Sequence, residues 1–331
     1  MAYMDFIEMY ARDVKKTPEL LLSQKPMSFP VSTNMRGERF ASLLDRHLDI
    51  DFHNVRALDI GCAYGGYALA LADRGAQVAG IDVNPKMIQY AEANAKGSHD
   101  VRLEIHDASG SSLRKAFPKN SFNLIILNDV LEHIYDTTSL IHNLNYLLDD
   151  GGAVYFKIPN GLSPRFIMSE GHRKIFALTL LDPDCWFYLY PKRASVFYRP
   201  FQYFMALFSH YGLPEMQLLD DENVFRRFTA PKLRRQIKQI FEKSREFQYP
   251  SVEVARLARE RIVKFRDDFD DDVATCSEDY VKLKYGSYFF SGFAARKSTI
   301  FQPKQTRLIE NFPPLALHAA EDVNSGQDLA E

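Results

Sequence analysis

Three acidic side chains follow three apolar segments at positions where they can recognise a nucleoside-like ligand. Asp59, Asp82 and Asp107 each lie at or just after the end of a run rich in Val, Ile and Leu. A carboxylate at the first position attracts a cationic group. The second can accept hydrogen bonds from ribose hydroxyls, and the third from the exocyclic amine of adenine. Together the three acids predict a site for an adenosine that carries a positive charge.

A glycine-containing loop adjoins the first of these acids. The segment L-D-I-G-C-A-Y-G-G-Y covers residues 58–67, and its glycines allow a sharp turn and close approach of the backbone to a ligand. Two ligand classes fit: a dinucleotide, read as Gly61-x-Ala63-x-x-Gly66, or a cationic cofactor such as S-adenosylmethionine. Asp59 favours the cation, because a carboxylate ~4 Å from a pyrophosphate would repel it by roughly 1 to 4 kcal/mol.

The elements that must position these residues follow from the alternation of apolar runs and helical patterns between residues 54 and 160. This alternation is typical of a parallel sheet with crossover helices, whose carboxyl edge binds ligands. Asn84 and Pro85 open one helix as N-cap and first residue. Strands are predicted at 55–60, 77–83, 101–108, 122–127 and 153–158, with helices at 65–74, 85–95, 112–117 and 137–148 and a turn at Gly151-Gly152.

Beyond residue 159 the alternation stops, and we predict a helix at 200–211, a strand at 215–219 and a last strand at 287–295. The expected domains are an N-terminal helical cap (1–53), an S-adenosylmethionine-binding α/β core (54–160), an aromatic-rich lid insertion (161–199), a core helix and strand (200–222), a helical insertion (223–284), the final core strand (285–302), and a C-terminal strap with a flexible tail (303–331).

Composition excludes several classes of protein. The 331 residues are 46% hydrophobic and 25% charged, which matches an ordinary globular chain and not a disordered or fibrous one. Lys plus Arg (41) nearly balance Asp plus Glu (43), so no nucleic-acid partner is expected. The three cysteines, Cys62, Cys185 and Cys276, are widely spaced, which argues against a disulfide framework or a zinc site and favours a reducing compartment.

The start of the chain and its longest uncharged stretch bear on localisation. Asp5 and Glu8 lie where a secretory signal would need basic and then apolar residues. Residues 201–214 fall short of the ~20 apolar residues that span a bilayer. We therefore expect a cytoplasmic protein that neither crosses a membrane nor uses a metal.

In order and spacing, four segments resemble the class I S-adenosylmethionine-dependent methyltransferases. L-D-I-G-C-A-Y-G resembles the first motif of that family, G-I-D-V-N-P-K-M-I the second, the Asp107-Ala108 pair the third, and N-D-V-L-E-H-I the segment after the fourth strand. The resemblance covers residues 54–212 and 287–295. It implies a doubly wound, Rossmann-like α/β fold with a seven-stranded, mostly parallel sheet, an antiparallel last strand and helical insertions.

The resemblance also implies roles for single residues. The backbone of residues 61–65 would line the methionine moiety, Asp82 would hold the ribose, Asp107 would face the adenine edge, and Asn128 and Asp129 would face the methyl group. Ala63 stands where the family usually has its middle glycine. The expected cofactor-binding residues are Asp59, Gly61, Cys62, Ala63, Gly65, Asp82, Val83, Asp107, Ala108 and Asn128.

Methyl transfer to a hydroxyl needs a base as well as positioning. Candidates are Asp129, Glu132 and His133, which follow the fourth strand, and His172, which lies in a G-H-R-K tetrapeptide of the lid. His133 and His172 have alternative readings as a structural histidine and an ordinary loop residue. We expect Asp129, His133 and His172 to be the catalytic residues.

Two features of the insertions point to the acceptor. Trp186, Tyr188 and Tyr190 either stack on a sugar or aromatic acceptor or pack the lid against the core. The cations Arg226, Arg227, Arg234, Arg235 and Lys238 either meet an anionic acceptor, such as a lipid-linked sugar at a membrane face, or lie on the solvent side of an ordinary apolar helix stripe made by Phe225, Phe228, Leu233, Ile237, Ile240 and Phe241.

These observations lead to a hypothesis with two alternatives. The hypothesis is an S-adenosylmethionine-dependent methyltransferase that acts on the hydroxyl of a glycan, a lipid-linked sugar or a small molecule. A fainter resemblance to methyltransferases of bacterial surface-glycan synthesis, in the I-P-N and S-P-R-F-I-M-S segments, supports the glycan. The alternatives are an NAD(P)-dependent oxidoreductase and a non-catalytic S-adenosylmethionine-binding protein. The acceptor, the base and the oligomeric state stay open.

Overall fold

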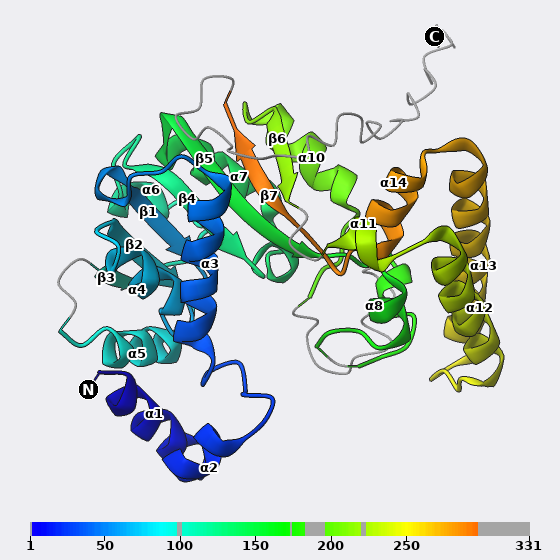
Figure 1. The fold of residues 1–331 in the computed structure, drawn as a ribbon, viewed down its shortest axis with the longest axis horizontal. Coiled ribbons are helices and arrows are strands. Elements are labelled where there is room, and N and C mark those ends of the chain that lie inside the picture. Colours follow the sequence, from blue (N-terminus) through cyan, green and yellow to red (C-terminus); the bar gives the residue numbers. More distant parts are fainter. Residues whose placement is uncertain (1, 98–100, 173, 183–195, 220–222, 297–331) are drawn as a thin grey trace, which may run out of the picture.

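A seven-stranded sheet forms the centre of the computed structural model, which describes residues 2–97, 101–172, 174–182, 196–219 and 223–296. The strand order is β3-β2-β1-β4-β5-β7-β6 (Figure 1). Neighbouring strands from β3 to β5 are parallel, whereas β7 is antiparallel to both β5 and β6. The expected doubly wound α/β sheet is confirmed. The strands are β1 (Arg56–Ile60), β2 (Gln77–Asp82), β3 (Val101–Ile105), β4 (Phe122–Asn128), β5 (Leu148–Pro159), β6 (Glu215–Leu219) and β7 (Phe289–Ala295).

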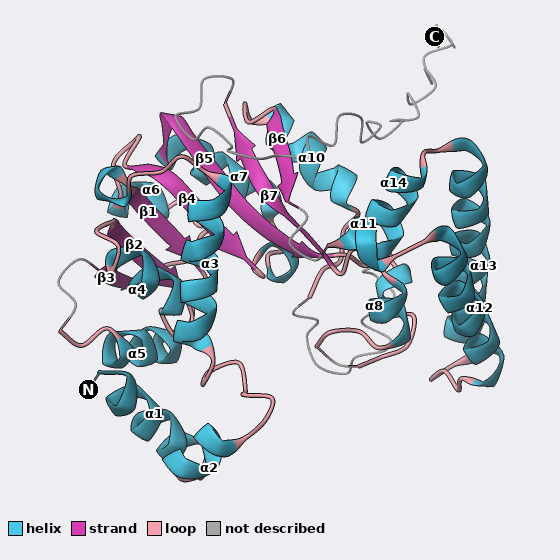
Figure 2. Cartoon of the chain, viewed as in Figure 1, coloured by secondary structure: helices cyan, strands magenta, loops and turns pink. Residues whose placement is uncertain are grey.

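Helices cover both faces of the sheet and extend beyond it at two ends (Figure 2). They are α1 (Ala2–Asp13), α2 (Pro18–Ser23), α3 (Thr33–His47), α4 (Gly66–Ala72), α5 (Pro85–Asn94), α6 (Leu113–Ala116), α7 (Thr137–Leu147), α8 (Pro164–Met168), α10 (Phe201–His210), α11 (Val224–Arg227), α12 (Ala230–Glu246), α13 (Val252–Thr275) and α14 (Glu278–Val281). Short helical turns lie at η1 (Phe52–Asn54), η2 (Leu131–His133), η3 (Leu178–Leu180) and η4 (Lys282–Gly286).

Strand β4 is buried on both faces, as its apolar sequence predicts. Leu124 and Ile126 belong to the core cluster beneath α3 and α4, and Ile125 and Leu127 belong to the cluster beneath α7 and α10. All four side chains are inaccessible to solvent. The alternation follows from the period of two along a strand.

Capping residues fix the starts of the helices that follow the sheet's carboxyl edge. The side chain of Asn84 accepts a hydrogen bond from the Lys86 amide, and Pro85 is the first residue of α5. The Asp136 carboxylate accepts from the Ser139 amide at the start of α7. Each cap satisfies an amide that has no partner inside its helix.

The predicted turn at Gly151-Gly152 is wrong, because both glycines lie inside β5. Phe122 pairs with Leu148 and Leu124 with Ala153, so an irregularity in the register absorbs the extra residues of β5. A Cβ atom on Gly152 would lie 2.7 Å from Leu148 Cδ1. The glycine pair therefore serves a close contact within the strand and not a chain reversal.

The insertion after β6 folds into helices α11 to α14 with a core of its own. Figure 1 shows α12 and α13 side by side at one end of the molecule. The prediction of an apolar helix stripe that faces a core is confirmed. Leu233, Ile237 and Ile240 are buried in one cluster with Ile262 and Phe265. The cations near the start of the insertion lie on its surface, where Arg234 pairs with Asp270.

The N-terminal helices pack on the other side of the molecule. Helix α1 contacts α5, and α3 lies against α4. A Cβ on Gly37 would come 1.9 Å from the Gly66 carbonyl oxygen, so the two helix backbones touch at this point.

Some predicted features lie outside the described residues. They include the aromatic residues Trp186, Tyr188 and Tyr190, together with Cys185 and the C-terminal segment 303–331. In the part of the chain that is described, Cys62 and Cys276 are free thiols. No helix there is both long enough and apolar enough to cross a bilayer.

Candidate functional site

The loop between β1 and α4 owes its shape to three residues with left-handed backbone angles. Gly61, Ala63 and Gly65 have φ values of 68°, 47° and 76°. A Cβ on Gly61 would lie 2.8 Å from Val130 Cγ2, and one on Gly65 would lie 3.2 Å from Ala91 Cβ. Glycine at 61 and 65 therefore permits both the turn and the close packing.

Ala63 is strained, which the sequence did not reveal. A left-handed conformation brings the Cβ of an L-residue close to the following carbonyl oxygen, at a cost of roughly 1 to 2 kcal/mol. The Ala63 amide donates a hydrogen bond to Asp82 Oδ2 at 3.2 Å. This bond holds the loop to the end of β2 and compensates for part of the strain.

A cavity of about 540 Å³ opens beside this loop, at the carboxyl edge of the sheet. The ends of β1, β2 and β3 and the segment after β4 form its walls. The lining residues include five of the ten predicted for the cofactor: Gly61, Asp82, Val83, Asp107 and Ala108. The full lining is Ile60, Gly61, Ile81, Asp82, Val83, His106, Asp107, Ala108, Ser109, Asp129, Val130, His133, Ile134, Tyr135 and Asp136.

Two of the lining acids are held by local hydrogen bonds. Asp82 Oδ1 accepts from the Asn84 amide at 2.8 Å, and Asp107 Oδ1 accepts from the amide and hydroxyl of Ser109. Val83 also lines the cavity, with 69% of its surface exposed. An exposed apolar side chain beside fixed carboxylates suits a ligand with a flat ring and hydroxyl groups.

Asp59, Cys62, Ala63, Gly65 and Asn128 are not among the residues that line this cavity. The Asp59 side chain is buried, and its Oδ2 has no hydrogen-bond partner among the described residues. Burial raises the pKa of Asp59 to about 7, with a hydrogen bond from the Ala68 amide acting in the opposite direction. The cation-attracting role of Asp59 stays a prediction.

The residues after β4 meet the N-terminal region through one ion pair. Asp129 has a φ of 56°, accepts a hydrogen bond from Asn128 Nδ2 at 3.1 Å, and lies 3.5 Å from the Arg36 guanidinium of α3. Arg36 also covers the ring of Phe29. The predictions missed Arg36, because no local pattern links α3 to the end of β4.

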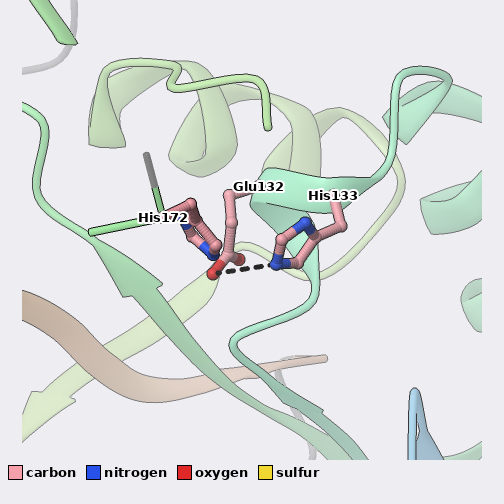
Figure 3. A group of neighbouring side chains, drawn as sticks. All are labelled: Glu132, His133 and His172. Atoms are coloured by element: carbon pink, nitrogen blue, oxygen red, sulfur yellow. Dashed lines mark ion pairs between the residues drawn. The ribbon is translucent and has the colours of Figure 1, made fainter. Parts of the chain in front are cut away.

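Glu132, His133 and His172 come together after β4 (Figure 3), and of the three only His133 lines the cavity. His133 Nε2 lies 3.9 Å from Glu132 Oε1, and the two imidazole rings meet edge to face with centroids 4.8 Å apart. Burial, followed by the charge of Asp129, raises the pKa of the Glu132 carboxyl. The structure thus joins two of the three predicted catalytic residues, His133 and His172, although the sequence separates them widely.

His172 belongs to a second group that includes a buried acid. Glu170 Oε1 accepts from the His172 amide at 2.7 Å and lies 3.0 Å from His172 Nδ1. The Tyr198 hydroxyl donates to the same oxygen at 2.6 Å. Burial and this carboxylate raise the pKa of Tyr198. The predictions missed Glu170 and Tyr198, although an acid two residues before His172 was a visible signal for the first.

This arrangement is suited to proton transfer. With Nδ1–H of His172 donating to Glu170, Nε2 becomes the acceptor nitrogen, as in sites where a carboxylate orients a histidine base. Glu132, His133 and His172 also each offer a ligand atom within 4.8 Å of the others, so they could hold a metal ion. The expectation that the site uses no metal stays a prediction.

Comparisons with known proteins place the cavity within a recognised domain. Residues 58–156 match the family described as "Methyltransferase domain". The "Ubiquinone biosynthesis O-methyltransferase" of Paracidovorax citrulli is 31% identical over 114 residues, which cover 34% of this chain and 48% of that protein. "Phosphoethanolamine N-methyltransferase 3" of Arabidopsis thaliana is 32% identical over 117 residues, which cover 34% of this chain and 23% of that protein.

Solved structures were compared with the chain as well. The structure of a "SAM dependent methyltransferase from Archaeoglobus fulgidus" aligns with a TM-score of 0.43 at 15% identity, covering 86% of this chain and 97% of that one. The chain spans about half the length of the ubiquinone O-methyltransferases that it matches.

Proposed function

The chain belongs to the class I S-adenosylmethionine-dependent methyltransferase superfamily, with S-adenosylmethionine as its cofactor, and on this premise we propose that it methylates a hydroxyl group of an acceptor. One observation carries the proposal: the cavity of about 540 Å³, which Asp82, Asp107, the exposed Val83 and the Gly61 turn line together. When bound, S-adenosylmethionine supplies an electrophilic methyl group. The cavity fits that cofactor, because four acids and no Lys or Arg line it.

In this proposal Asp82 accepts hydrogen bonds from the ribose, Val83 packs on the adenine, and Asp107 accepts from the adenine amine. Gly61 has no side chain, so the methionine part can lie against its backbone. A Cβ at this position would also press on Val130, which lines the cavity. Asp129 lines the cavity on the side of β4, where it faces the methyl group. The contacts described above hold the carboxylates of Asp82, Asp107 and Asp129 in place.

His172 takes the proton of the acceptor hydroxyl. His172 Nε2 would accept the proton that the acceptor hydroxyl loses on methylation. Glu170 orients the ring and stabilises the imidazolium that forms, and Tyr198 fixes Glu170. His133 contacts the His172 ring, lines the cavity and offers a second nitrogen base.

The proposed acceptor is a small molecule with a hydroxyl group, with a glycan or a lipid-linked sugar as the larger forms of the same chemistry. Two relatives support methylation of a small molecule, since one is named as an O-methyltransferase and the other as an N-methyltransferase. The histidine pair supports a hydroxyl acceptor, which must lose a proton during methyl transfer. An uncharged amine needs no such base, because it can attack first and lose its proton afterwards.

The test uses S-adenosylmethionine with an isotopically labelled methyl group, mixed with the purified protein and cell extracts. Mass spectrometry should find label in an acceptor, and calorimetry should detect binding of S-adenosylhomocysteine. Label that never leaves the donor, with the cofactor bound, would favour the non-catalytic alternative. Binding of NADH with no binding of S-adenosylhomocysteine would favour the oxidoreductase.

A further inference from the structure

A second cavity, of about 360 Å³, lies between the sheet edge and the helical insertion. We propose that it binds the acceptor, and that the acceptor carries an anionic group, a phosphate or a carboxylate, on an apolar ring. This inference rests on the proposed function, because it names the class of molecule that receives the methyl group.

The position of this cavity fits an acceptor. Pro159 and Asn160, which end β5, line it, and β5 is the neighbour of β4 in the sheet. It therefore opens at the same carboxyl edge as the cofactor cavity. Parallel α/β sheets bind their ligands along this edge.

The two cavities adjoin each other. The Arg199 guanidinium, in the second cavity, donates hydrogen bonds to the carbonyl oxygens of Ile134 and Tyr135, which line the cofactor cavity. Tyr198, also in the second cavity, donates to Glu170, which contacts His172. His172, which lines neither cavity, thus contacts His133 of the cofactor cavity and is linked through Glu170 to Tyr198 of the second.

The charges of the two cavities are opposite. Asp82, Asp107, Asp129 and Asp136 line the cofactor cavity, with no Lys or Arg. Four cations and one acid line the second cavity: Arg199, Arg261, Lys264, Lys284 and Asp268. Because opposite charges attract and like charges repel, the first cavity selects a cationic ligand and the second an anionic one.

Two of the cations retain capacity for an anion. Among the described residues, no carboxylate lies within ion-pair distance of Arg199, whose hydrogen bonds go to neutral carbonyl oxygens. Arg261 pairs with Asp182 through one terminal nitrogen, while its Nε atom is buried without a hydrogen-bond partner in the described part of the chain. A buried N–H of this kind is costly unless a ligand accepts from it.

Aromatic and aliphatic side chains make up the rest of the wall. Phe201, Phe265 and Phe290 contribute rings, and Leu162 and Leu180 add aliphatic surface. A cavity of this volume is at the small end of ligand sites, so it accommodates one ring system with its substituent. An apolar body with a single anionic group matches both the lining and the size.

The experiment uses the full chain and two fluorescent probes, 1-naphthyl phosphate and 1-naphthol. We expect the wild-type protein to bind the phosphate at least tenfold more tightly than the neutral naphthol. The double variant Arg261→Gln/Lys264→Gln should lower that preference below twofold. The single variant Lys264→Gln, at a largely exposed position of α13, should lower it by about threefold and guards against misfolding of the double variant.

Arg256→Gln is the matched control, because Arg256 lies on the same helix, pairs with Glu260 and does not line the second cavity. It should keep the wild-type preference. Equal binding of the two probes by the wild type overturns the inference. So does an unchanged preference in folded double and single variants, or an equal loss in Arg256→Gln.

Calorimetry with S-adenosylhomocysteine on the same samples separates this inference from the proposed function. Normal cofactor binding in every variant, together with the expected probe results, supports both. Failure of the wild type to bind S-adenosylhomocysteine contradicts the methyltransferase even where the anion site is present. Normal cofactor binding without any preference for the phosphate contradicts the anion site alone.

Discussion

The imidazole rings of His133 and His172 meet edge to face, and this contact joins the turn after β4 to the segment after α8. His133 borders the cofactor cavity, and Glu170 fixes His172 from the other side. The two histidines therefore offer two nitrogen bases near each other, close to the cavity with the acidic lining and to the one with the mostly basic lining. The predictions below test this arrangement and the loop that precedes it.

Replacement of His172 should lower methyl transfer without affecting the cofactor. We expect His172→Asn to reduce the rate of label transfer by about 100-fold or more, the usual range for loss of a general base, while affinity for S-adenosylhomocysteine stays within twofold. Raising the pH toward the pKa of the acceptor hydroxyl should restore part of the rate. His210→Asn, at an exposed position of α10, is the control. A loss that is equal at every pH would indicate a structural role.

Replacement of Asp82 should weaken cofactor binding. We expect Asp82→Ala to lower affinity for S-adenosylhomocysteine at least tenfold in calorimetry, because the ribose loses its acceptor and the Ala63 amide loses its partner. Asn84 still caps α5, so thermal unfolding should confirm a folded protein. Glu92→Ala, on the exposed face of α5, should bind normally. Unchanged affinity in Asp82→Ala would rule out the ribose role.

The buried Asp59 should make stability depend on pH. Its pKa is about 7 in the folded protein and about 4 in the unfolded chain, so between these values the folded state binds a proton that the unfolded state has released. The free energy of unfolding should therefore fall as the pH rises from about 4 to 7, by at most ~1.4 kcal/mol per pH unit.

Urea unfolding at pH 5 and pH 8 measures this effect. Asp59→Asn should become more stable relative to the wild type at pH 8 than at pH 5, by about 2 kcal/mol, because the amide cannot ionise. Asp73→Asn, at an exposed position near the end of α4, should show no such difference. Parallel pH profiles for the wild type and Asp59→Asn would contradict the prediction.

Two glycines allow backbone strain to be separated from a steric clash. Gly61→Ala forces a Cβ to within 2.8 Å of Val130 Cγ2 at a φ of 68°, whereas Gly97→Ala meets no atom within 4 Å at a φ of 90°. We expect Gly97→Ala to cost about 1 kcal/mol and Gly61→Ala about 3 kcal/mol in urea unfolding. Adding Val130→Ala should recover part of the stability that Gly61→Ala loses, but none of the stability that Gly97→Ala loses. Equal costs for the two glycine variants would argue against the clash.

Much of the fold follows from local patterns. The apolar runs that became β1, β2 and β4 predict these strands within a residue or two, since burial on both faces demands continuous apolar sequence. The turn predicted at Gly151-Gly152 was wrong because glycine is common both in turns and at strand irregularities. Pairing with β4, which the local sequence does not show, distinguishes the two.

The site was harder to predict, because its parts meet only through tertiary contacts. Asp82, Asp107 and Val83 follow strand ends and could be placed from the sequence, whereas Asp59 points into the core instead of the cavity. Arg36, Glu170 and Tyr198 come from three separate segments, and no spacing in the sequence relates them. The basic residues of the second cavity come from α13, η4 and the segment before α10, not from the cation-rich start of the insertion.

The backbone contact between Gly37 and Gly66 bears on where this protein can be cut. The matched family segment starts at residue 58, yet Phe40 and Leu44 of α3 complete the apolar layer over the sheet. A fragment that starts at β1 would leave that layer open to water and deprive Asp129 of Arg36. The smallest autonomous folding unit is therefore larger than the segment that matches the family, and a fragment meant to fold on its own should retain α3.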